Sequence, residues 1–132
     1  MNYDTFRRVA VACNFAAAFN DNAKLTDTGK VDARNFASIM EHDAKYLSPG
    51  CVTGYSMLSI LLAKDGIDAA TFRWRGNATK GIEPHPMAAQ YMEYATAYLR
   101  EAFPSMRFDS VNTSTPKRRE NLPAAILDAL AI

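Results

Sequence analysis

The sequence predicts a helix-dominated α+β protein with about five helices and a small sheet of two or three strands. Apolar residues recur at three- and four-residue steps along most of the chain, which is the helical pattern. Residues 67–75 alternate instead, with Phe72 and Trp74 on one side, as in a strand. The 132 residues are enough for one core, so we expect one globular domain over residues 1–132.

The composition is that of a soluble globular protein, with 48% apolar and 22% charged residues. The net charge of +1 gives no global attraction to nucleic acid or to an anionic membrane. No segment approaches the roughly 18 apolar residues of a membrane span. Cys13 and Cys51 make no disulfide framework, and we expect reduced thiols in a cytoplasmic protein.

Two helices are expected in the first third of the chain. The first covers residues 4–19, and the turn-forming residues 20–22 end it. The second begins at Asp32, whose carboxylate can cap exposed amides while Val31 and Phe36 form a hydrophobic staple.

A third helix, over residues 49–64, is the expected centre of the fold. Ser48 is a suitable cap, and Pro49 suits the first helical position because its missing N–H would have no partner there. Apolar residues surround almost the whole circumference of this helix, which is typical of a buried one. Gly66 supplies the left-handed residue that ends it.

The remaining elements alternate between strands and helices. The strand over residues 67–75 is followed by a helix over 87–103, a second strand over 106–111 and a short helix over 121–130. The two strands could pair in parallel, with the helix as crossover, or antiparallel.

Cys51 is the first candidate for chemistry, because it falls at about the third position of the expected central helix. Unpaired backbone N–H groups and the helix dipole at that place would lower the pKa of its thiol and favour the thiolate. The same N–H groups could hold a developing oxyanion. The alternative interpretation is a small buried residue at a helix start.

Residues 51–76 resemble the cysteine–helix–strand unit of transglutaminase-like and papain-like thiol enzymes. In transglutaminase-like cores a cysteine opens a helix that ends in Gly-Ile-x-Ala before a strand, which corresponds here to Cys51 and Gly66–Ile67–Asp68–Ala69. The resemblance implies an acyl-transfer or hydrolysis reaction in which Cys51 is the nucleophile, His85 the base and Asp109 the orienting acid. The family places its histidine at the start of a strand, whereas His85 lies between two prolines just before a helix.

Two basic clusters suggest a different function. Aromatic and cationic residues alternate at Arg73, Trp74 and Arg75, and a second cluster follows at Lys117, Arg118 and Arg119. If the clusters converge, they could contact phosphates while Trp74 stacks on a base. The alternative is that Trp74 packs in the core and the arginines are solvated or paired with Glu83 and Glu120.

The leading hypothesis is a small interaction or accessory protein, because the charge is balanced and no complete catalytic set is visible. It predicts an exposed apolar patch for a protein partner. The thiol enzyme and the nucleic-acid-binding module are the alternatives. No residue spacing matches a zinc site, and we expect neither a metal nor a cofactor.

Overall fold

The computed structural model describes residues 1–22, 35–41, 55–105, 120–130 and 132. In these residues the chain forms six α-helices and two short 3-10 helices: α1 (Tyr3–Ala12), α2 (Phe15–Asn22), α3 (Asn35–Glu41), α4 (Met57–Lys64), η1 (Ala69–Thr71), η2 (Ala78–Lys80), α5 (Pro86–Ala102) and α6 (Ala124–Ala129). The predicted α+β class is wrong for this part of the chain, because it contains no strand and no sheet. The second predicted strand, over residues 106–111, lies outside the described residues.

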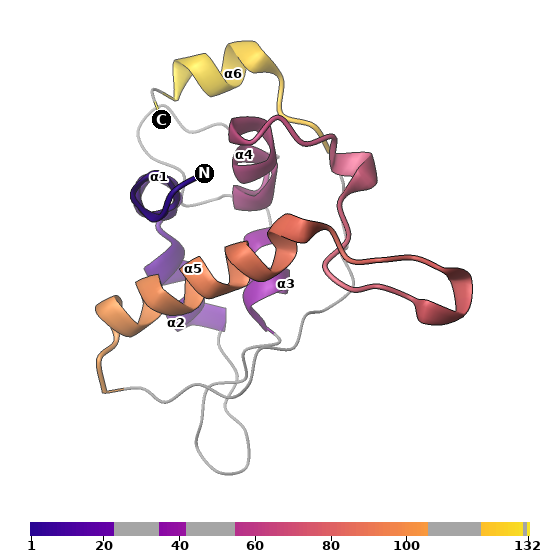
Figure 1. Cartoon of the computed structure of the whole chain (residues 1–132). Coiled ribbons are helices and arrows are strands. Elements are labelled where there is room, and N and C mark those ends of the chain that lie inside the picture. Colours follow the sequence, from indigo (N-terminus) through magenta and orange to yellow (C-terminus); the bar gives the residue numbers. More distant parts are fainter. Residues whose placement is uncertain (23–34, 42–54, 106–119, 131) are drawn as a thin grey trace.

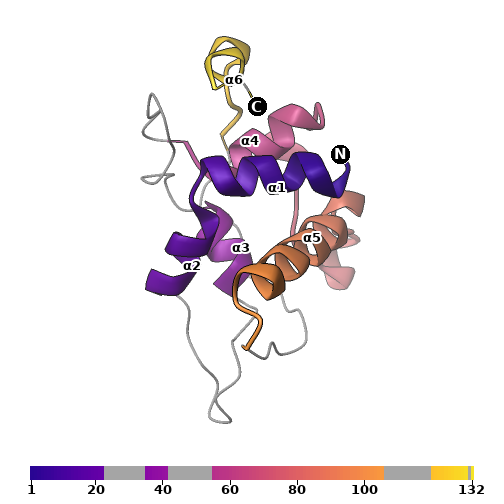
Figure 2. The same cartoon turned by 90° about the vertical axis from the view of Figure 1, so that its left-hand side faces the viewer.

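The helices pack in an irregular cluster rather than in layers. Helix α1 contacts α2, α4 and α5, while α3 contacts α2, α4 and α5 from the other side of the core. Helix α6 lies beyond α4 at one end of the molecule, and α2 lies toward the opposite end (Figures 1 and 2).

Aromatic and long aliphatic side chains from most of the helices make up the core. Phe19 of α2 contacts Phe36 of α3 edge-on at 5.7 Å between ring centroids and Phe103 after α5 at 5.5 Å. The largest fully buried side chains are Phe6, Phe15, Phe19, Phe36, Met40, Ile60, Leu61, Phe72, Tyr91, Met92 and Leu99. Burial of such side chains is the main stabilising contribution, at about 1.5–3 kcal/mol each.

The single helix predicted over residues 4–19 is two helices, and Asn14 separates them. Asn14 has φ +49°, a left-handed conformation that asparagine adopts more readily than most residues. The turn redirects the chain so that Cys13 and Phe15, on either side of it, are both buried. Packing on both sides of the turn therefore overrides the continuous helical pattern of the sequence.

Helix α4 is buried as predicted but begins later. All side chains from Met57 to Leu62 are buried. Ser56 has extended backbone and caps the helix by accepting a hydrogen bond from the Ser59 backbone N–H at 3.1 Å. The third position of this helix is therefore Ser59 and not Cys51.

The predicted strand over residues 67–75 is instead a loop that contains η1. The alternation itself is real, because Phe72 and Trp74 are both buried. However, the carbonyls that a partner strand would use are bound locally, since the Arg73 guanidinium Nη1 donates to the carbonyls of Ala70 and Phe72, both at 2.9 Å. Asp68 is the N-cap of η1 and accepts a hydrogen bond from the Ala70 N–H.

The last two helices agree with the sequence more closely. Helix α5 begins and ends one residue earlier than the predicted range of 87–103. Helix α6 lies inside the predicted range of 121–130 but has only six residues, none of them buried.

Candidate functional site

The structure describes one member of the predicted catalytic triad. Cys51 and Asp109 lie outside the described residues, so their distance from His85 stays untested. His85 is the N-cap of α5, and its Nδ1 accepts a hydrogen bond from the Met87 backbone N–H at 3.1 Å. Its ring packs against Phe72 with 5.5 Å between centroids.

This capping bond limits what His85 can do as a base. A neutral imidazole that accepts through Nδ1 carries its proton on Nε2. To take a proton through Nε2, the ring would need the other tautomer, and Nδ1–H could no longer accept from Met87. General-base chemistry at His85 would therefore cost the N-cap of α5, worth about 1 kcal/mol.

The residues predicted to contact nucleic acid do not form one exposed surface in the described part. Lys117, Arg118 and Arg119 lie outside the described residues. Trp74 is only 3% exposed, so its ring offers no face on which a base could stack. Arg73 is half-buried against nearby carbonyls, and Arg75 is exposed.

Glu41 is a buried polar residue that sequence reasoning missed. It ends α3 with 3% exposure, and its Oε1 accepts a hydrogen bond from the indole Nε1 of Trp74 at 2.5 Å. No local sequence signal marks this pairing, because its partners are 33 positions apart.

A second buried polar cluster lies where α4 ends. The Tyr91 hydroxyl donates to Asp65 Oδ2 at 2.5 Å, and the amino group of Met1 contacts Asp65 Oδ1 at 2.7 Å. Burial, reinforced by the neighbouring Asp65 carboxylate, raises the pKa of Tyr91 above its ordinary value. The hydroxyl therefore stays protonated and links α5 to α4.

The longest fully exposed stretch in the described part of the chain is a hairpin that precedes α5, which we call the exposed hairpin (residues 75–84). Every one of its residues is exposed. It projects away from the helices at the right of Figure 1. It begins directly after buried Trp74, and the backbone N–H of His85 donates to the carbonyl of Arg73 at 2.9 Å to close its base.

Its own backbone bonds hold the exposed hairpin in shape. Asn77 and Ile82 form an isolated antiparallel bridge, with hydrogen bonds of 2.7 and 2.9 Å. Gly81 has φ +66°, the left-handed conformation that glycine adopts without strain. Gly76 allows the two arms to approach, since a Cβ there would lie 2.6 Å from the carbonyl oxygen of Ile82.

The exposed hairpin has an unbalanced charge. It carries two cations, Arg75 and Lys80, and one anion, Glu83, and the half-buried Arg73 adds a third cation at its base. Among the described residues, the side chains of Arg75, Lys80 and Glu83 form no ion pair. Ile82 belongs to the same hairpin and is 39% exposed.

The apolar patch expected of an interaction protein is not found in the described residues. Their only exposed large apolar side chains are Val11, at 51%, and Ile82, at 39%, and these belong to different elements. This result counts against the apolar interface expected from the sequence, and any contact surface in the described part of the chain would have to be polar.

Comparison of the chain with protein-family models, curated proteins and solved structures found no match. Over the described ranges, no three His, Cys, Asp or Glu side chains are grouped as metal ligands. In the same ranges, no helix is both long and apolar enough to cross a membrane.

Proposed function

We propose that this protein is an interaction protein that contacts an acidic surface of a partner protein through the exposed hairpin. The observation that carries the proposal is an ordered, projecting segment whose cations have no ion-pair partner among the described residues. Ordering a backbone costs about 1–2 kcal/mol per residue, and the exposed hairpin contributes nothing to the core in return. Such segments on a fixed scaffold are common recognition elements.

The geometry supports a protein partner more than a nucleic acid. Nucleic-acid binding without base readout needs several phosphate contacts and aromatic stacking. The exposed hairpin offers Arg75 and Lys80 for charge contacts, while the ring of Trp74 is buried and Arg73 is bound to carbonyls. Two cations in the same hairpin as the exposed side chain of Ile82 suit a small acidic protein surface with an apolar contact.

Site-specific photo-crosslinking tests the proposal. A photo-reactive residue replaces Thr79 in the exposed hairpin or, as a matched control, Ala97 on the exposed face of α5. We expect the Thr79 position to give a discrete adduct in the native cells that protease removes and nuclease does not. The Ala97 position should give none.

Charge reversal identifies the contacts. Arg75→Glu with Lys80→Glu should lower the yield of the Thr79 adduct about tenfold or more, since like charges would then face each other. Arg7→Glu with Arg8→Glu makes the same charge change on the exposed face of α1 and should leave the yield unchanged. Absence of a Thr79 adduct, or a nuclease-sensitive adduct, would refute the proposal, the latter in favour of nucleic acid.

A further inference from the structure

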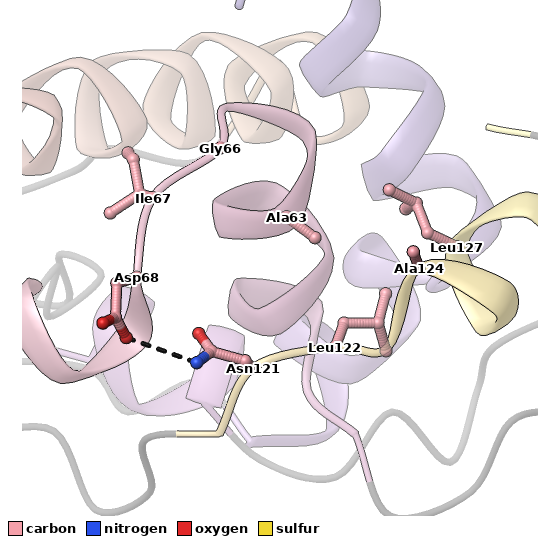
Figure 3. A pocket seen from close by; sticks show the side chains of 8 residues that line it. All are labelled: Ala63, Gly66, Ile67, Asp68, Asn121, Leu122, Ala124 and Leu127. Atoms are coloured by element: carbon pink, nitrogen blue, oxygen red, sulfur yellow. Dashed lines mark hydrogen bonds between the residues drawn. The ribbon is translucent and has the colours of Figure 1, made fainter.

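A second candidate site is an open cavity between the C-terminal end of α4, the loop after it and α6. The cavity has a volume of about 370 Å³ and is lined by Ala63, Gly66, Ile67, Asp68, Asn121, Leu122, Ala124 and Leu127. Figure 3 shows these side chains coming from the end of α4, from the loop after it, from the segment that leads into α6 and from α6 itself. Small-molecule sites measure roughly 300–1,000 Å³, so this cavity is at the lower end of that range.

The C-terminal segment that forms one side of the cavity is fixed by hydrogen bonds at its two ends, and Ile126 and Leu127 of α6 pack, partly buried, against the core between them. Asn121 Oδ1 accepts a hydrogen bond from the Ala69 N–H at 2.7 Å, and Leu122 is buried. At the other end, Lys64 Nζ donates to the carbonyl oxygen of Ile132 at 2.5 Å. None of the α6 residues is fully buried, which leaves the cavity open beneath it.

The lining is apolar except for one paired carboxylate and amide. Asn121 Nδ2 donates to Asp68 Oδ1 at 3.2 Å (Figure 3). The Ala70 N–H donates to the same oxygen at 3.0 Å. Both bonds lower the pKa of Asp68, so the carboxylate is ionised at neutral pH. Within the described residues, no hydrogen bond involves Asp68 Oδ2.

Among the described residues that line the cavity, the exposed Asp68 has the only charged side chain. The nearest cation on α4, Lys64, is directed to the carbonyl of Ile132 and does not line the cavity. The cavity therefore combines an apolar surface with one negative charge that retains an open acceptor oxygen. A ligand that matches both needs an apolar chain and a cationic donor.

We propose that this cavity binds a small primary amine with an apolar chain, whose ammonium group pairs with Asp68. The chain would contact the apolar lining from Ala63, Ile67, Leu122 and Leu127. This inference is independent of the exposed hairpin, which shares no residue with the lining.

Three probes of equal chain length test the inference: hexylamine, hexanol and hexanoate. Binding is followed by NMR through the methyl signals of Ala63 and Ala124. We expect hexylamine to bind a few-fold more tightly than hexanol, because it adds a charge-assisted hydrogen bond and an ion pair with Asp68, whose exposure to solvent keeps the gain small. Hexanoate should bind more weakly than hexanol. Equal affinity for all three, or no shift at these methyl groups, would overturn the inference.

Variants separate the charge from the cavity. Asp68→Asn keeps the size of the side chain and should abolish the preference for hexylamine while hexanol still binds. Asp128→Asn removes the same charge from an exposed position of α6 outside the lining and should preserve the preference. A preference that survives Asp68→Asn would contradict the inference.

Filling the cavity provides the last test. Ala63→Leu places a larger side chain in the lining and should abolish binding of all three probes. Ala124→Leu fills the cavity from its exposed side and should also abolish binding of the probes. The larger side chain there leaves the core unchanged, because Ala124 is exposed. Unchanged binding in a folded Ala124→Leu variant would show that the probes bind elsewhere.

Discussion

The indole of Trp74 donates a hydrogen bond to the carboxylate of Glu41 at 2.5 Å, and each side chain is only 3% exposed. The bond joins the end of α3 to the residue that precedes the exposed hairpin. It satisfies a carboxylate whose burial would otherwise be costly. Phe72 packs edge-on against the same indole at 4.9 Å between ring centroids, which fixes the ring from a second side.

Trp74→Phe should therefore lower the free energy of unfolding by about 1–3 kcal/mol, because a buried acceptor loses a donor. Urea unfolding followed by circular dichroism measures the change. In a Glu41→Leu background, Trp74→Phe should lower the free energy of unfolding by clearly less, because the acceptor is already gone. Equal costs in the two backgrounds would show that the bond does not contribute to stability.

Tyr91→Phe should change how stability depends on alkaline pH. The pKa of Tyr91 is raised in the folded state by burial and then by Asp65, so its contribution is complete below the ordinary value of 10.0 and is lost as the pH rises above that value. At neutral pH the variant should be less stable by about 1–2 kcal/mol, through loss of the bond to Asp65. Above pH 10.0 its stability should fall less steeply than that of the wild type. Urea unfolding at several pH values measures the free energy of unfolding of both proteins. If that free energy fell equally steeply with pH in the variant and the wild type, the prediction would be wrong.

Cys13 should not react with iodoacetamide in the native protein. Burial raises the pKa of its thiol from 9.0 to about 12, which lowers the thiolate fraction roughly a thousandfold near neutral pH. The measurement uses a Cys51→Ser variant, so that one thiol remains. Labelling should be absent without denaturant and complete in urea. Rapid native labelling would mean that the α1–α2 turn opens readily.

Cys51 can be tested in the same way in a Cys13→Ser variant, by measuring how the rate of alkylation depends on pH. A midpoint of that dependence below the usual pKa range of a thiol would support the thiol-enzyme alternative.

Gly76→Ala should disturb the exposed hairpin without unfolding the core. The new Cβ would lie 2.6 Å from the Ile82 carbonyl oxygen and 2.9 Å from Pro84 Cδ, so the arms must separate. We expect the amides of Asn77 and Ile82 to lose protection from hydrogen exchange, while those of α5 keep it. Thr79→Ala, at an exposed position of the same hairpin, is the control and should leave the protection of the hairpin amides and of the α5 amides unchanged.

Sequence patterns predicted those elements whose signals are local. Helix α5 has a clear apolar stripe and prolines near both ends, and its bounds agree to within one residue. The burial of α4 followed from apolar residues on all its faces. Its start did not, because Ser48 and Ser56 are equally good caps by residue type, and only the latter is observed to cap this helix.

The errors occurred where hydrogen bonds that the apolar pattern does not record, both local and distant in sequence, decide the backbone. The alternation of Phe72 and Trp74 is typical of a strand, yet a sheet also needs a partner, and here Arg73 and His85 bind the carbonyls instead. The pairing of Trp74 with Glu41 and the wall that Asn121 forms beside Asp68 join segments far apart in the chain. No periodicity within either segment records such a pairing.

The position of Trp74 also gives this molecule a built-in optical reporter. It is the only tryptophan of the chain, so all indole fluorescence comes from one ring at the foot of the exposed hairpin. A partner that pulls or tilts the exposed hairpin would alter the bond between the indole and Glu41. The emission wavelength and intensity should then follow occupancy of the exposed hairpin in unlabelled protein.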